Sequence, residues 1–328
     1  MSDLKNSHFL VVGAGAIAQR HIGILSRLVP GAQFTVWRRR KISCGEGVAV
    51  VHRLADALAA EPVAAIIASP ASDHLAAATA LAEIGVDLFI EKPLAATLDG
   101  VDELLQQCAA RRVVLQVGYC LRFSPGFATL ASLVAKGAIG RPLHLRATVG
   151  QYLPDWRPNR DYRDSVSAQA SLGGGVVLEL SHEFDYVRTL LGAPEAVTAR
   201  TWHSGTIEVD TEDCADVIVN FAGGAMASIH LDMLSRPAER CCRIIGAEGT
   251  VEWDLLSGTV RLFRSSVGAW KEIDATAPED MYTRQMRSFL DCIAMRSTPI
   301  VSGRDGRCSL ALALAAKRAA SEGRTIVA

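Results

Sequence analysis

The chain has 328 residues, a formal net charge of −1 and a pI of about 6.7, and 49% of its residues are hydrophobic. This length suggests two domains, and the apolar content is ample for buried cores. A chain so close to neutral does not have the basic excess that nucleic-acid binding usually requires, so we expect no nucleic-acid partner. No apolar run reaches the roughly 18 residues of a membrane span, so we expect no membrane partner.

The eight cysteines predict a reducing environment. They show no Cys-x-x-Cys spacing and most lie inside apolar runs, which is typical of buried thiols and not of disulfides or a zinc site. The first expected strand begins near His8, which leaves no room for a signal peptide. We therefore predict a cytoplasmic protein without a metal site.

The chain opens with the pattern of a strand, a glycine-rich turn and a helix. An apolar run over residues 8–12 is followed by Gly-Ala-Gly-Ala-Ile-Ala and then by helical periodicity as far as Leu28. One glycine permits the tight turn and the next leaves room for a pyrophosphate, while Ala18 takes the place of the usual third glycine. The first N–H groups of the helix would bind the phosphates. The dinucleotide contacts predicted by this pattern are Gly13, Gly15, Ala16 and Ile17.

The second strand, residues 33–37, predicts the form of the cofactor. It ends at Trp37, where an enzyme that prefers NAD usually has an acid to bind the ribose 2′-hydroxyl. Arg38 and Arg39 follow instead, and no acid appears before Glu46. Arginines pair with a 2′-phosphate, whereas a carboxylate would repel it. We therefore expect these three residues to contact the cofactor and favour NADP, with NAD as the alternative because such arginines also occur in solvated loops.

The next segments predict a doubly wound parallel sheet. Apolar strands at 63–68, 87–90 and 113–117 alternate with helical patterns at 75–84 and 98–110, which is the order of a Rossmann domain. The carboxyl ends of such strands line a ligand crevice, so Lys92 would point into it. A lysine in this crevice can donate and accept a proton, which suits it to acid–base catalysis.

Short motifs follow the strands of this domain: Gly13-Ala14-Gly15-Ala16-Ile17, Ser69-Pro70 with His74, Glu91-Lys92-Pro93, and Gly118-Tyr119 with Arg122-Phe123. In this order they resemble the motifs of the Gfo/Idh/MocA family, the glucose–fructose oxidoreductase and inositol dehydrogenase group. The resemblance implies NAD(P)-dependent oxidation or reduction of a ring hydroxyl in a sugar, cyclitol or nucleotide-sugar.

The same resemblance implies roles for individual residues. Lys92 would be catalytic, the Lys92–Pro93 peptide would be cis, and Tyr119 would contact substrate. Cys120 departs from the pattern because many relatives carry Asn there, which puts one polar cofactor contact in doubt. Further cofactor contacts implied by the resemblance are Ser69, Pro70, His74, Glu91, Lys92 and Arg122.

A polar, aromatic loop over residues 151–168 indicates where substrate would bind. It contains Tyr152, Asp155, Trp156, Arg157, Arg160, Asp161, Tyr162 and Arg163. Aromatic rings stack on sugar faces and charged groups bind hydroxyls or a phosphate, so we predict Tyr152, Trp156 and Arg157 as substrate contacts. A surface or dimer-contact loop is an equal alternative.

Three glycines at 173–175 precede an expected helix over 176–187. The polar residues that would share one arc of this helix are Glu179, His182, Glu183 and Tyr186. The segment resembles the second signature of the family, which implies that His182 exchanges a proton together with Lys92. Asp185 or Glu179 would polarise its ring, although Glu179 lies three residues before His182 where many relatives have four. Tyr186 is predicted to contact substrate.

The rest of the chain predicts a large, mostly antiparallel open sheet. Six strands between 197 and 264 are joined by short glycine-containing turns, and helical patterns follow at 281–295 and 308–320. The expected fold is therefore α/β, with a Rossmann domain at 1–121 and an α+β domain at 122–328 for substrate binding and oligomerisation. We expect the last helix to pack on the first domain. A bare sheet face usually meets a partner, so we also expect a homodimer or homotetramer.

Two other functions are compatible with the same fold. One is a non-catalytic sensor that binds NAD(P), since folds are reused without their chemistry. The other is an enzyme that keeps its nicotinamide bound and uses it transiently to process a glycoside. The presence of both Lys92 and His182 favours the oxidoreductase over the sensor.

Overall fold

The computed structural model describes residues 4–38 and 49–328. The chain divides into two compact units, each made of two segments. The first unit contains residues 1–120 and 279–307, and the second contains residues 121–278 and 308–328.

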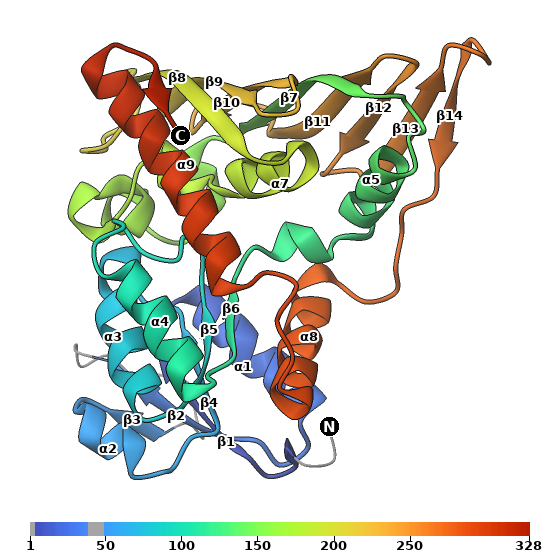
Figure 1. Ribbon diagram of the computed structural model, residues 1–328. Coiled ribbons are helices and arrows are strands. Elements are labelled where there is room, and N and C mark those ends of the chain that lie inside the picture. The colour runs from blue at the N-terminus through green and yellow to red at the C-terminus, as the bar shows by residue number, and fades with distance from the viewer. Residues whose placement is uncertain (1–3, 39–48) are drawn as a thin grey trace. The chain divides into compact units, whose positions relative to one another are not determined.

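The first unit is built on a parallel sheet of six strands in the order β3-β2-β1-β4-β5-β6 (Figure 1). The strands are β1 (His8–Val12), β2 (Gln33–Trp37), β3 (Ala49–Val51), β4 (Ala64–Ile67), β5 (Asp87–Ile90) and β6 (Leu115–Val117). The helices are α1 (Ala16–Leu28), α2 (Leu54–Leu58), α3 (Ala71–Glu83), α4 (Val101–Arg111) and α8 (Met281–Met295). The strand order reverses between β1 and β4, which is the switch point where such sheets bind ligands. The predicted Rossmann fold is confirmed.

The burial of the strands explains this arrangement. All four residues of β4 and of β5 are buried, as expected for strands that are covered by helices on both faces. On α1 the buried residues Ala18, Ile22 and Leu25 recur every three or four positions, so one stripe of the helix packs on the sheet.

Helix α8 belongs to the first unit, whereas the sequence analysis placed it in the second domain. Met286, Phe289 and Leu290 are fully buried in the core that β1, β4 and α1 build, and the ring of Phe289 lies 5.6 Å from that of Phe89. Arg296 at the end of α8 binds the carboxylate of Asp87 at 2.6 and 3.1 Å. The amphipathic pattern of a helix predicts a buried stripe but does not say against which domain the stripe packs.

The second unit is built on a mixed sheet of nine strands in the order β14-β13-β12-β11-β7-β10-β9-β8-β15. The strands are β7 (Pro142–Gly150), β8 (Pro194–Trp202), β9 (Cys214–Phe221), β10 (Met226–Asp232), β11 (Glu239–Gly246), β12 (Gly249–Asp254), β13 (Thr259–Arg264), β14 (Ala269–Ile273) and β15 (Ile326–Val327). The predicted antiparallel pairing holds for every neighbouring pair except β7 and β10, which are parallel.

Helices α5 (Pro125–Ala135), α6 (Val176–Glu179) and α7 (His182–Leu191) pack on one face of this sheet. Along the central strands, alternate side chains are buried under these helices and the others point to the opposite face. Edge strand β14 was not predicted, and its five residues have no buried face that would produce an alternating pattern.

The C-terminal helix is divided between the two units. Helix α9 runs from Gly303 to Glu322, and from residue 308 onward it belongs to the second unit, in which the sequence analysis placed it. Lys317 binds both carboxylate oxygens of Glu212 at 2.9 and 3.1 Å, and β15 then pairs with β8. These contacts hold the end of the chain against the second unit.

The helix expected over residues 176–187 is divided in two. Helix α6 ends at Glu179, and α7 begins at His182 after Leu180 and Ser181. The break separates Glu179, on α6, from His182, Glu183 and Tyr186, which lie on α7, so the four residues do not share one continuous helix.

Residues 4–38 and 49–328 contain no membrane-spanning helix, no candidate metal site and no disulfide. No helix in these ranges is long and apolar enough to cross a membrane. They contain no group of three or more metal-binding side chains placed to hold an ion, and their seven cysteines are free thiols.

Helix α7 is anchored to the sheet by a buried ion pair that makes a testable prediction. Glu183 is fully buried and accepts two hydrogen bonds of 2.9 Å from Arg240 on β11. Replacing Arg240 with Met leaves this carboxylate buried without its partner, which should lower the free energy of unfolding by about 3–5 kcal/mol. Urea denaturation followed by tryptophan fluorescence measures the loss.

A second arginine on β11 provides the matched control. Arg243 pairs with Glu252 at 3.1 Å, but its side chain is 47% exposed. Arg243→Met should therefore cost about 1 kcal/mol or less. Equal losses for the two variants would show that the buried pair does not anchor α7.

Candidate active site

The glycine turn after β1 has the geometry of a phosphate cradle. Gly13 has φ +102°, and a Cβ there would lie 2.7 Å from the carbonyl oxygen of Ala68 at the end of β4. Gly15 caps α1 with ordinary backbone angles, and a Cβ there would meet nothing within 4 Å. Gly13 thus permits close approach of two strands, whereas Gly15 borders open space beside Ala16 and Ile17 at the start of the helix. The N-terminus of a helix beside such a turn is a common binding place for phosphates.

The adenosine end of the predicted site is described in part. Trp37 ends β2, and its indole Nε1 is buried without a hydrogen-bond partner among the described residues. The backbone N–H of Arg38 donates to the carbonyl of Val51 on β3 at 3.1 Å. Arg39 lies outside the described residues.

The loops after β4 and β5 are joined by His74. One ring nitrogen lies 2.8 Å from the carbonyl oxygen of Ser69 and the other lies 3.0 Å from that of Pro93. The side chain is buried, and this burial lowers the pKa of His74 although the two carbonyl contacts oppose the change. We interpret His74 as a support for the two loops, since both nitrogens are engaged by backbone. The nearby hydroxyl of Ser69 is buried and has no partner among the described residues.

Lys92 follows β5 and is held there by the residue before it. The carboxylate of Glu91 is buried, with one oxygen 2.6 Å from Nε2 of His21 on α1 and the other 3.1 Å from the backbone N–H of Lys92. The Lys92–Pro93 peptide is cis, as the resemblance implied. A Cβ at Gly118 would lie 2.7 Å from the second carboxylate oxygen, so only glycine leaves room for Glu91. Glu91 therefore ties Lys92 to the dinucleotide helix.

Tyr119 and Cys120, which follow β6, are more buried than a contact to substrate or cofactor would lead us to expect. Tyr119 has no exposed surface and Cys120 is 3% exposed. Burial, with Cys120 beside it, raises the pKa of the Tyr282 hydroxyl. Tyr119, Cys120 and Tyr282 therefore belong to the interior of the first unit.

Arg122, predicted as a cofactor contact, binds α7 within the second unit. Its guanidinium donates to the hydroxyl of Thr189 at 2.6 Å and lies 3.5 Å from the carboxylate of Asp185. Asp185 is buried and also accepts from Ser309 on α9 at 3.0 Å. These contacts join the start of the second unit, α7 and α9.

The residues predicted around His182 point in different directions. His182 begins α7 and is 8% exposed. Glu179 accepts from the hydroxyl of Ser167 at 2.7 Å, so it is turned toward the loop 151–168. Tyr186 is fully buried, and its ring lies 6.0 Å from that of Trp253. Burial raises the pKa of Tyr186 well above its usual value. Tyr186 therefore belongs to the core and not to a surface that faces substrate.

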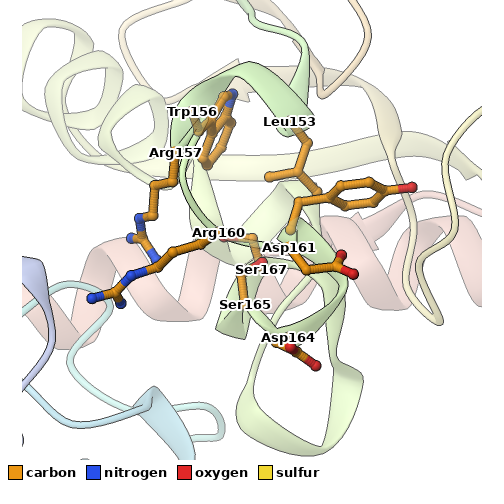
Figure 2. A pocket seen from close by; sticks show the side chains of 9 residues that line it. Leu153, Trp156, Arg157, Arg160, Asp161, Asp164, Ser165 and Ser167 are labelled. Atoms are coloured by element: carbon orange, nitrogen blue, oxygen red, sulfur yellow. The ribbon is translucent and has the colours of Figure 1, made fainter.

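The loop 151–168 encloses a pocket of about 340 Å³ (Figure 2). Short 3₁₀ turns shape this loop, which the sequence analysis expected to be irregular. Two of the predicted substrate contacts, Trp156 and Arg157, line the pocket. The complete lining is Leu153, Trp156, Arg157, Arg160, Asp161, Tyr162, Asp164, Ser165 and Ser167.

The third predicted contact in the loop, Tyr152, has another role. The guanidinium of Arg236 lies 3.3 Å from the centre of its ring, and its backbone N–H donates to Ser235. Tyr152 therefore attaches the loop to the segment that follows β10.

Sequence reasoning missed residues whose importance depends on contacts between distant segments. His21 and Ser309 are polar residues buried on the packed faces of α1 and α9. A polar side chain at a position that the helical period makes buried is the one signal that could have found them. Ser167 gave no such signal, because nothing in the loop predicts its contact with Glu179.

Comparison with known proteins places both parts of the chain in one family. Residues 7–119 match a family model described as an oxidoreductase family with an NAD-binding Rossmann fold, and residues 127–252 match the GFO/IDH/MocA C-terminal domain. The chain is 27% identical to myo-inositol 2-dehydrogenase of Thermotoga maritima over 80% of this chain and 79% of that protein. It is 30% identical to 1,5-anhydro-D-fructose reductase of Ensifer adhaerens over 73% and 72%.

A solved structure confirms the fold over the whole length. The WlbA dehydrogenase of Bordetella pertussis, in complex with NADH and UDP-GlcNAcA, superimposes with a TM-score of 0.84. The match covers 99% of this chain and 98% of that one at 23% identity. Together with the two family models, these matches show that the chain belongs to the Gfo/Idh/MocA family of oxidoreductases, whose first domain is an NAD-binding Rossmann fold.

Proposed function

We propose that this protein transfers a hydride between the nicotinamide of NAD(P) and a secondary hydroxyl or ketone of a sugar, cyclitol or nucleotide-sugar. The observation that carries the proposal is the position of Lys92. It follows β5 at the carboxyl edge of a Rossmann sheet, and the Glu91 contacts fix its backbone to α1. The inositol dehydrogenase and anhydrofructose reductase relatives act on substrates of this class.

The residues of the chain supply position and proton transfer. Bound NAD(P) would accept or donate the hydride at the nicotinamide. Removing a hydride from a carbinol carbon leaves a proton on its oxygen, and we assign the transfer of this proton to Lys92 and His182. Gly13, Gly15 and the first residues of α1 would hold the pyrophosphate, and Ser69 and Pro70 would border the same edge of the sheet. The two acids, Glu179 and Asp185, act here as positioning residues of α6 and α7.

Replacing Lys92 with Met tests the proton-transfer role. The variant keeps a side chain of similar length without the amine, so turnover should fall about 100-fold or more while the Kd for the cofactor stays nearly unchanged. Production of reduced cofactor measures turnover, and quenching of tryptophan fluorescence measures binding.

Lys136 provides the control, because it is an exposed lysine at the end of α5. Lys136→Met should retain full activity. Near-normal turnover in Lys92→Met would reject Lys92 as the proton-transfer group. Product formation without net reduced cofactor would favour transient use of a bound nicotinamide, and cofactor binding without any turnover would favour a sensor.

We further propose that NADP is preferred over NAD. The support is the sequence after β2, where Trp37 and Arg38 stand in place of an acid that would repel a 2′-phosphate. Arginine binds phosphate through paired, charge-assisted hydrogen bonds.

The preference can be tested at Arg38. Replacing Arg38 with Ser should weaken NADP binding about 10-fold and leave NAD binding nearly unchanged, because one charge-assisted contact is lost. Titration of both reduced cofactors by fluorescence gives the two dissociation constants. Tighter binding of NAD than of NADP by the unmodified protein would contradict the proposal.

We also propose that two or more copies associate through the open face of the nine-stranded sheet. Ile218 on β9 and Met226 on β10 lie on this face and are 45% and 39% exposed. Near them, His230 lies between Asp216 at 2.7 Å and Asp232 at 3.3 Å. Apolar side chains in the middle of a sheet face are typical of a surface that is covered by a partner.

Sedimentation velocity tests the assembly. The unmodified chain should sediment as a dimer or tetramer, and Ile218→Glu with Met226→Glu should shift it to monomer because charges cannot be buried in an apolar contact. Ile84→Glu is the control, since Ile84 is 55% exposed at the end of α3 and is not part of this sheet. A monomeric unmodified chain would refute the proposal.

A further inference from the structure

We infer that the pocket in the loop 151–168 binds an anionic group of the substrate, a carboxylate or a phosphate, through Arg157 and Arg160. The inference rests on the proposed function, because it names the class of substrate for the same site. It selects a sugar acid or a sugar phosphate over a neutral sugar or cyclitol.

Two positive charges of the pocket, on Arg157 and Arg160, form no ion pair with an acid in the part of the chain that the structure describes. Both guanidinium groups line it, and among residues 4–38 and 49–328 neither has a hydrogen bond or an ion pair to an acidic side chain. Figure 2 shows the two side chains extending to the same side of the pocket. A bound anion would offset these two positive charges by its attraction to both. The planar fork of each arginine matches carboxylate and phosphate oxygens.

A third arginine in the same loop, Arg163, has a structural role. Arg163 binds both carboxylate oxygens of Asp161 and also lies 3.2 Å from Glu208. Its charge is therefore compensated within the protein. Asp161 and Asp164 also line the pocket, but in Figure 2 they lie on the side away from Arg157 and Arg160. The pocket thus has one basic side and one acidic side.

The remaining lining fits a sugar beside the anion. The indole of Trp156 is fixed by a hydrogen bond of 3.0 Å from Nε1 to the carbonyl of Gln151. Aromatic faces stack on sugar rings, and the hydroxyls of Ser165 and Ser167 complete the lining. A volume of about 340 Å³ is near the lower end of the range for small-molecule sites. This size indicates a ligand comparable to a monosaccharide.

The pocket is linked to the helix that carries His182. Ser167 lines the pocket, and its hydroxyl donates to Glu179 at the end of α6, three residues before His182. An anion held by the two arginines would therefore position the rest of the substrate relative to α6 and α7. Both ends of this link lie in the second unit.

Isothermal titration calorimetry of the full chain tests the inference with four probes: inorganic phosphate, glucose 6-phosphate, glucuronate and glucose. We expect at least one of the two anionic sugars to bind 10-fold or more tightly than glucose. The double variant Arg157→Gln with Arg160→Gln should lose about 10-fold to 100-fold in that affinity, because charge-assisted hydrogen bonds are removed. Binding of phosphate and glucose 6-phosphate would identify a phosphate site, whereas binding of glucuronate would identify a carboxylate site.

Arg200→Gln is the matched control. Arg200 is an exposed arginine on β8 that does not line the pocket, so this variant should bind the anionic sugars as the unmodified chain does. Glucose binding as tightly as both anionic sugars would overturn the inference. Unchanged affinity in the double variant would overturn it as well.

Cofactor reduction distinguishes this inference from the proposed function. Anion binding that depends on both arginines, without hydride transfer to NAD(P), would keep the pocket assignment and reject the oxidoreductase. Turnover of neutral sugars that the double variant leaves unchanged would keep the oxidoreductase and reject the pocket assignment.

Discussion

The carboxylate of Glu91 is the constraint on which the first unit's site depends. It is buried at the end of β5, where one oxygen meets His21 of α1 and the other meets the backbone N–H of Lys92. Gly118 at the end of β6 leaves the space that this carboxylate occupies. The helix that we propose to hold phosphates and the lysine that we propose to transfer protons are thereby fixed to one another through a single side chain. A buried polar group of this kind is stable only when its oxygens have partners.

The second unit uses buried charges in a comparable way. Glu183 fixes α7 to β11 through Arg240, and Asp185 joins α7 to α9 through Ser309. These contacts hold the backbone around His182 without using His182 itself. The loop 151–168 is attached to α6 by the contact of Ser167 with Glu179. The contacts within the second unit therefore hold together the helix that carries His182 and the loop that carries Arg157 and Arg160.

Much of this could be predicted from sequence because it is local. The turn at Gly13, the strand that precedes Glu91 and Lys92, and the alternation of strands with helices depend on neighbouring residues, and they were predicted correctly. The docking of α8 depends on contacts with distant segments, and it was not predicted. Tyr186 was predicted as a substrate contact because it shares an arc of the helix with His182, but its ring packs against Trp253 in the core. A helical period also cannot indicate where a break such as the one after Glu179 falls.

A crystal structure of the protein with NADP and a bound sugar phosphate or sugar acid tests the central claim most directly. The account predicts that Nζ of Lys92 and a ring nitrogen of His182 lie within about 3 Å of one substrate hydroxyl, next to the nicotinamide. A complex in which either side chain lies away from that hydroxyl, with the cofactor bound at the glycine turn, would contradict it.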